Sequence, residues 1–150
     1  MDKKIAIGCD HGGFKLKEVL KSYLIKKGYN IKDFGTYSEN PSDYPVVGYK
    51  LAEDISKGKI KRGILICKSG IGMAIMANKL PRVRSAVCDN TKQTKTSRLH
   101  NDTNVLSLGS EYINESKAKK IVNTWLNTPS LGGRHKRRVD QIKRFEKKKV

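Results

Sequence analysis

The sequence has no long hydrophobic run. Across its 150 residues, no segment approaches the roughly 18 apolar residues that a membrane-spanning helix needs. Near the N-terminus, the apolar stretch at 5–7 is too short for the hydrophobic region of a secretion signal. We therefore expect a soluble, cytoplasmic protein that has no membrane partner.

Cysteines and acidic residues are also scarce. The three cysteines, Cys9, Cys67 and Cys88, are an odd number and lack the C-x2-C spacing of a zinc site, which favours free thiols in a reducing compartment. Only 14 residues are acidic against 32 lysines and arginines, so the net charge is +18. A charge of this size suits a nucleic-acid binder, which is one alternative for the function.

Aromatic residues are too few and too scattered to favour that alternative. They make up 7% of the chain, and no stripe of aromatic side chains alternates with basic ones, as stacking on single strands requires. The basic residues are spread along the chain, with one dense block near the C-terminus. We therefore expect most of the excess charge to be solvated surface, with no specific nucleic-acid partner and only weak, salt-sensitive association.

Short apolar, β-branched runs alternate with amphipathic stretches along the chain. The runs predict strands at 4–9, 29–34, 63–67, 85–88 and 105–108. The amphipathic stretches predict helices at about 14–27, 43–56, 71–79, 91–99 and 116–128, and Ser42 or Asp43 could cap the second of these. A last, strongly basic helix is predicted at about 138–148, after the glycines at 132–133.

This alternation predicts an α/β fold. Strands separated by helices form a parallel sheet that is covered on both faces, here a Rossmann-like, doubly wound five-stranded sheet in a three-layer α/β/α arrangement. We expect a single domain over residues 1–150 that ends in the C-terminal helix. Ligands of such sheets bind at the carboxyl ends of the strands. Asp10 and His11 follow the first strand, and Cys67 and Ser69 lie at the end of the third.

The segment at 67–72, Cys-Lys-Ser-Gly-Ile-Gly, has the pattern of a strand that turns into a helix. Free N–H groups and the positive end of the helix dipole at such a turn can hold a phosphate or stabilise an oxyanion. Thiols beside helix N-termini lose their proton more readily, so Cys67 is a candidate base or nucleophile. The alternative is a small buried cysteine that ends a core strand.

Three further segments gather polar chemistry. In the segment at 9–13, Asp10 could bind sugar hydroxyls and His11 could bind phosphate or transfer protons, although helix capping and a surface histidine would also explain them. The segment at 98–104 combines an imidazole, carboxamides, a carboxylate and a guanidinium, only part of which turn chemistry explains. The segment at 132–138 joins flexible glycines to arginines that suit bidentate phosphate contacts.

Together these segments resemble the type B ribose-5-phosphate isomerases, within the sugar-isomerase family that also contains the galactose-6-phosphate isomerase subunits. The resemblance rests on GCDHGG at 8–13, DYP at 43–45, GILICKSGIGMAIMANK at 63–79, SRLHNDTNVLSLG at 97–109 and GGRHKRRV at 132–139. These motifs occur in the family's order and spacing, and they cover nearly the whole chain. The resemblance implies interconversion of ribose 5-phosphate and ribulose 5-phosphate through an enediolate, as part of the pentose phosphate pathway.

The resemblance also implies a role for each matching residue. The proton-transfer base is Cys67, the residue that helps to open the furanose ring is His100, and Ser69 stabilises the enediolate with the backbone amides through Gly70, Ile71 and Gly72. The substrate is further held by Asp10 and Tyr44 at the sugar, Asn101 at the developing oxyanion, and His11, Arg134 and Arg138 at the phosphate. The implied assembly is a homodimer or homotetramer in which His100, Asn101 and their loop reach into the neighbour's active site, with no metal or organic cofactor.

Two positions depart from the family's pattern. Glu111 stands where most members have an arginine that assists phosphate binding, and Lys68 stands where the residue after the cysteine is usually glycine. A carboxylate at 111 would repel phosphate unless it points away. Lys68 either supplies a compensating charge or points to solvent, and the rarity of buried lysine favours solvent.

Two enzymatic alternatives remain. The first is isomerisation of a six-carbon sugar phosphate, such as allose 6-phosphate, because no motif reports the depth of the pocket. The second is a cysteine hydrolase or amidotransferase that pairs Cys67 with a histidine. The chain lacks a G-x-C-x-G elbow, and phosphate-binding arginines would have no purpose in such an enzyme.

Overall fold

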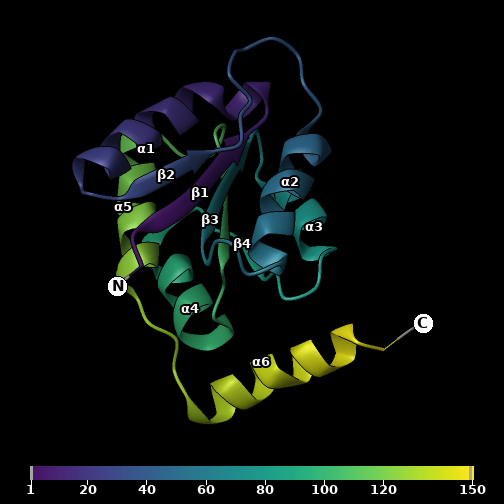
Figure 1. The fold of residues 1–150 in the computed structure, drawn as a ribbon. Coiled ribbons are helices and arrows are strands. Elements are labelled where there is room, and N and C mark those ends of the chain that lie inside the picture. The colour runs from purple at the N-terminus through teal and green to yellow at the C-terminus, as the bar shows by residue number, and fades with distance from the viewer. Residues whose placement is uncertain (1, 149) are drawn as a thin grey trace.

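A five-stranded parallel sheet forms the centre of the molecule. The computed structural model describes residues 2–148 and 150. Its strands pair in the order β2-β1-β3-β5-β4, and every pair is parallel (Figure 1). Their bounds are Lys4–Cys9 for β1, Asn30–Asp33 for β2, Gly63–Cys67 for β3, Ser85–Val87 for β4 and Val105–Gly109 for β5.

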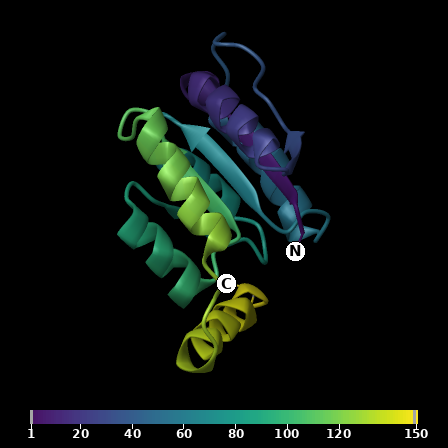
Figure 2. The ribbon, with the colours of Figure 1, turned by 90° about the vertical axis from the view of Figure 1, so that its left-hand side faces the viewer.

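Helices cover both faces of this sheet. They are α1 (Phe14–Lys26), α2 (Tyr44–Ser56), α3 (Ile71–Asn78), α4 (Thr91–Asn101), α5 (Glu115–Asn127) and α6 (Gly133–Glu146), with a short 3-10 turn, η1, at His11–Gly13. On one face α1, α4 and α5 lie side by side, and α2 and α3 pack together on the other (Figures 1 and 2). The three-layer, doubly wound α/β fold predicted from the sequence is confirmed. Within the described residues, no helix is both long and apolar enough to cross a membrane.

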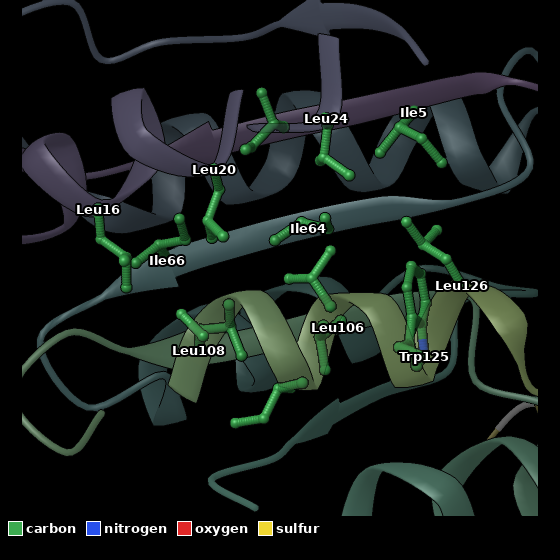
Figure 3. Close-up of a cluster of buried hydrophobic side chains, with 14 of the residues drawn as sticks. Ile5, Leu16, Leu20, Leu24, Ile64, Ile66, Leu106, Leu108, Trp125 and Leu126 are labelled. Atoms are coloured by element: carbon green, nitrogen blue, oxygen red, sulfur yellow. The ribbon is translucent and has the colours of Figure 1, made fainter. Parts of the chain in front are cut away.

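The larger hydrophobic core lies between the sheet and the α1–α5 layer. Leu16, Leu20 and Leu24 recur every four residues along α1 and so share its buried face, where they meet strand residues such as Ile64 (Figure 3). At the end of α5 the indole N–H of the buried Trp125 donates to the hydroxyl of Thr103 at 3.0 Å. This layer therefore fixes the loop before β5 as well as the sheet.

A smaller core lies under α2 and α3. It includes Leu51 of α2, Met73 of α3, and Leu65 and Cys67 of β3. All five residues of β3 are buried, as expected for a central strand that is covered on both sides. The side chain of Cys67 thus belongs to this layer at the point where the strand ends.

The order of the strands reverses between β1 and β3. From β1 the chain moves outward to β2, whereas after β3 it moves to the opposite side of the sheet, to β4 and β5. The amide of Asp10 donates to the carbonyl oxygen of Ile66 at 3.2 Å, so the residues that follow both strands lie next to each other. In doubly wound sheets such a switch point is where ligands bind.

The C-terminal helix begins five residues earlier than the sequence predicts. It starts at Gly133, whereas the sequence pattern predicts a start near 138. The paired glycines indicated a break, but only Gly133 has a positive φ, at +61°, and the chain turns helical directly after it. An i,i+4 ion pair of 2.7 Å between Lys136 and Asp140 stabilises the additional turn.

Candidate active site

The sulfur of Cys67 lies at the N-terminus of α3. Its side chain is almost buried, at 5% exposure, and Sγ accepts a hydrogen bond of 3.1 Å from the backbone N–H of Gly70. Gly70 has φ of +79°, a conformation that favours glycine and lets the chain turn sharply from β3 into the helix. The thiol is therefore held at a helix N-terminus, as the sequence predicted, although most of its surface packs within the core.

The turn after β3 packs tightly against the end of β5. A Cβ atom added at Gly109 would lie 2.6 Å from the backbone carbonyl carbon and oxygen of Ser69, and one added at Gly70 would lie 3.0 Å from the carbonyl carbon of Leu108. Only glycine allows this backbone-to-backbone approach. The Ser69 hydroxyl accepts a hydrogen bond from the Ile71 amide at 3.1 Å, which leaves its own proton free to donate.

Tyr44 lies directly over the start of α3. A Cβ atom added at Gly72 would lie only 2.3 Å from Cε1 of Tyr44, so the ring rests on the glycine backbone. Tyr44 is the first residue of α2 and is partly buried. The predicted site residues from DYP and from the glycine-rich turn are thus brought together.

Asp10 and His11 occupy the same edge of the sheet. One oxygen of the Asp10 carboxylate accepts from the Gly13 amide at 3.1 Å, so the residue caps η1 while lying beside the end of β3. The His11 amide donates to the hydroxyl of Ser42, and His11 Nδ1 lies 3.1 Å from both the amide nitrogen and the carbonyl oxygen of Ser42. Ser42 therefore offers a partner to the neutral ring and to the protonated ring.

The contact with Ser42 was not predicted. The sequence predicts Ser42 or Asp43 as a helix cap. Asp43 occupies the cap position without a side-chain hydrogen bond, and the Ser42 hydroxyl accepts from the His11 amide. Because 31 residues separate the two, no local pattern in the sequence could have indicated the contact.

The remaining predicted residues lie at the opposite end of the sheet. His100 and Asn101 end α4, just before β5 begins, whereas Cys67 lies level with the last residue of β5. Five strand residues separate these ends by about 13 Å at the usual rise per residue. Arg134 and Arg138 lie on α6, which lies below the sheet and packs against α4 (Figure 1). All four side chains are exposed, and none is near Cys67 of the same chain.

Hydrogen bonds fix some side chains of the 98–104 segment and leave others exposed. Arg98 donates to Asp102 at 2.9 Å, and Arg84 pairs with the same carboxylate at 3.4 Å. The Asn104 side chain accepts from the Arg84 amide at 2.7 Å. These contacts fix the loop, and they leave His100 and Asn101 exposed at its start.

Lys68 and Glu111, the two residues that depart from the family's pattern, are joined through their backbones beside the turn after β3. The Glu111 amide donates to the carbonyl oxygen of Lys68 at 3.0 Å, and both side chains are exposed. The stem of Lys68 crosses the backbone of Gly12, next to His11. Lys68 is exposed, as expected, but the stem of its side chain packs on the backbone of Gly12.

The other two cysteines are unsuited to proton transfer. Burial raises the pKa of the Cys9 thiol to about 12 and raises that of Cys88 as well. Both side chains are essentially inaccessible. In residues 2–148, no three His, Cys, Asp or Glu side chains gather in the arrangement of a metal site.

Comparisons with known proteins identify the family of this chain. Residues 5–142 match the model of the family described as Ribose/Galactose Isomerase. Ribose-5-phosphate isomerase B of Escherichia coli strain K12 is 42% identical over 147 residues, which cover 98% of this chain and 99% of that protein. A ribose-5-phosphate isomerase B structure from Clostridium thermocellum has 46% identity and a TM-score of 0.94, covering 96% of this chain and 97% of its own. One from Mycoplasma genitalium, with bound ribulose-5-phosphate, has 37% identity and a TM-score of 0.93, with 97% of each chain covered. The chain belongs to the ribose/galactose isomerase family.

Proposed function

We propose that this protein interconverts ribose 5-phosphate and ribulose 5-phosphate, with Cys67 as the base. The observation that carries the proposal is the contact between Cys67 Sγ and the Gly70 amide at the N-terminus of α3, beside Asp10. An N–H donated to sulfur and the positive end of a helix both stabilise negative charge there. The similarity to ribose-5-phosphate isomerase B proteins over nearly the whole chain supports the substrate.

The isomerisation requires one proton to move between neighbouring carbons. The Cys67 thiolate takes the proton from C2 of the open-chain aldose, and the electron pair forms the enediolate. The thiol then returns the proton to C1, while a proton moves between the two oxygens, which gives the ketose. Ser69 supports this step, because its hydroxyl accepts from Ile71 and can direct its proton to an enediolate oxygen.

Cys67 differs from the other two cysteines because it lies at the edge of the core, 5% exposed and beside the turn after β3. When substrate excludes water from such a site, charge interactions between enzyme and substrate become stronger. Asp10 adjoins the end of β3 and Tyr44 rests on Gly72 in the turn that follows it, which supports the proposal that both contact the sugar hydroxyls. The remaining requirements are ring opening, stabilisation of the developing oxyanion and phosphate binding.

We propose that a second copy of the chain meets those requirements. His100, for ring opening, and Asn101, for the oxyanion, lie at the opposite end of their own sheet from Cys67. They are exposed, as are Arg134 and Arg138, which with His11 would hold the phosphate. In a homodimer or a larger assembly, this surface would reach Cys67 of the neighbouring subunit.

Exposed apolar side chains support such an assembly. Ile71 and Ile75 of α3 are 55% and 56% exposed at the edge of the site, and Phe145 of α6 is 58% exposed. Only Val139 of α6 is buried. A helix at the periphery of the fold with apolar and cationic side chains exposed suits docking against another subunit. The proposed reaction predicts an enzyme of the pentose phosphate pathway in the cytoplasm. We expect residues 1–150 to form it as a single domain.

Substrate assays test the proposed function directly. Turnover of ribose 5-phosphate and allose 6-phosphate should be measured side by side with the intact enzyme. We expect a higher kcat/KM for ribose 5-phosphate. Preference for allose 6-phosphate would support the hexose alternative, and turnover of neither sugar phosphate would contradict the proposal.

A further inference from the structure

The side chain of Lys68 fits into a space that exists because residue 12 is glycine. A Cβ atom added at Gly12 would lie 2.5 Å from Cγ and 3.2 Å from Cε of Lys68. The stem of the lysine therefore packs on the backbone of η1 and does not extend freely into solvent. The same added atom would lie 3.4 Å from Oδ1 of Asp10, so the lysine lies along the edge that holds the proposed sugar contact.

The charge on Lys68 has no partner in the described part of the chain. Its ammonium group makes no ion pair within residues 2–148, where the neighbouring Lys15 pairs with Glu39 at 3.5 Å and Lys17 with Asp33 at 2.9 Å. Lys68 itself is exposed. An exposed ammonium that is held in place but unpaired is available to an anion.

The surrounding charges favour an anion supplied by the ligand. Two carboxylates, Asp10 and Glu111, lie at this edge, and both would repel a sugar phosphate. Neither forms an ion pair with Lys68 in the structure. His11 precedes Gly12, the glycine on which the stem of Lys68 packs, so both residues border the turn η1.

We infer that Lys68 contacts the phosphate group of the sugar-phosphate substrate, from the same subunit that supplies Cys67. This inference rests on the proposed function and adds a determinant of substrate class to it. Lys68 selects phosphorylated over neutral sugars, and it offsets the repulsion from Glu111. Gly12 is required because any side chain there would displace the lysine.

Steady-state kinetics of Lys68→Gln and Lys68→Arg with ribose 5-phosphate test the contact. A charged hydrogen bond to phosphate predicts that KM rises about tenfold in Lys68→Gln while kcat changes little, and that Lys68→Arg stays close to the unchanged enzyme. Lys15→Gln is the matched control, because it removes an exposed lysine that is already paired with Glu39. An unchanged KM in Lys68→Gln, or an equal rise in Lys15→Gln, would overturn the inference. A fall in kcat with an unchanged KM would also overturn it, because Lys68 would then act on proton transfer by Cys67.

A double-mutant cycle with Gly12→Ala tests the packing. Gly12 has no positive φ, so alanine is compatible with its backbone, but the added methyl group must displace Lys68. We expect Gly12→Ala to raise KM by a similar factor to Lys68→Gln, and to add nothing when Lys68 is already glutamine. Increases in KM that combine independently in the double variant would contradict the proposed packing of Lys68 on Gly12.

Binding of inorganic phosphate separates this inference from the proposed function. Titration calorimetry should show weaker phosphate binding by Lys68→Gln than by the unchanged enzyme and Lys15→Gln. If the unchanged enzyme isomerised no sugar phosphate but this difference remained, the proposed function would fail and the anion contact would stand. If turnover were normal and phosphate affinity did not depend on Lys68, the contact alone would fail.

Discussion

The imidazole rings of His100 and His135 stack face to face, with their centroids 4.1 Å apart and their planes 2° from parallel. His100 ends α4 and His135 lies in the first turn of α6, so the stack joins the two elements that carry the exposed phosphate and ring-opening candidates. Partial desolvation, the charge of His100 and the neighbouring arginines lower the pKa of His135. A neutral His135 ring avoids repulsion within the stack at pH 7.

This stack predicts that His135 positions His100. His135→Ala should lower kcat for ribose 5-phosphate about tenfold through loss of orientation, whereas His135→Phe keeps an aromatic face and should retain most activity. The pH profile of kcat provides the second readout, because His135→Phe removes a titrating neighbour of His100. Equal losses in both variants, with an unchanged pH profile, would assign His135 a merely structural role.

The order of the elements could be predicted from the sequence because the pattern is local. The run at 63–67 is continuously apolar, and the glycine-rich turn follows it at once, so the strand, the turn and the placement of Cys67 all follow from neighbouring residues. The start of α6 differs from the prediction because paired glycines favour a break, whereas the local Lys136–Asp140 ion pair and the stack of His135 on His100, a contact from another element, stabilise the first turns.

Contacts between distant residues could not be predicted in the same way. Ser42 and His11, or Lys68 and Gly12, meet only after β1, β3 and the loop before α2 have been assembled. The segment at 98–104 shows the same limit, because only the structure separates the scaffold of Arg98 and Asp102 from His100, which stacks on His135.

Lys17 and Asp33 form a buried ion pair that predicts how stability depends on pH. Lys17 is inaccessible to solvent and bonds to both oxygens of Asp33 at 2.9 Å. Burial opposes the charge of Asp33, but hydrogen bonds from Lys17, the Gly35 amide and Lys21 outweigh it, so the pKa of Asp33 lies below its usual range. This contribution is complete above the unfolded pKa of about 4 and is lost as pH falls through the lower, folded value.

Asp33→Asn should therefore destabilise the protein at neutral pH. We expect a loss of about 3 kcal/mol at pH 7, because Lys17 keeps a buried charge without its main partner, and a smaller difference from the unchanged protein at pH 3. Urea unfolding at the two pH values measures both. Asp140→Asn, which removes an exposed ion pair with Lys136, is the control and should change little. A difference that stays constant with pH would contradict the prediction.

The three thiols should react differently with iodoacetamide. Cys9 and Cys88 are buried and have raised pKa values, whereas Cys67 is 5% exposed and borders the proposed substrate site. We expect mass spectrometry of the folded enzyme to find Cys67 modified first, at a rate that ribose 5-phosphate slows. Comparable labelling of Cys9 or Cys88 would count against this assignment.

A site shared between subunits predicts complementation. Cys67→Ala and His100→Ala should each be inactive or nearly so, but a purified hybrid dimer of the two contains one site with both residues intact. Such hybrids should recover about half of the unmodified activity. A hybrid of Cys67→Ala with Ser69→Ala is the matched control and should show no recovery, because both residues belong to the same half of the site. Recovery in neither hybrid would place His100 outside the neighbouring site.

The most direct test of the account is turnover and binding of ribose 5-phosphate by Cys67→Ala, with titration calorimetry beside the assay. The variant removes the thiol but keeps the helix N-terminus, Asp10 and every phosphate contact. We expect isomerisation to fall to the limit of detection while the affinity for ribose 5-phosphate stays within about threefold, because binding and proton transfer use different groups. Turnover that survives the loss of the thiol would contradict the assignment of Cys67 as the base.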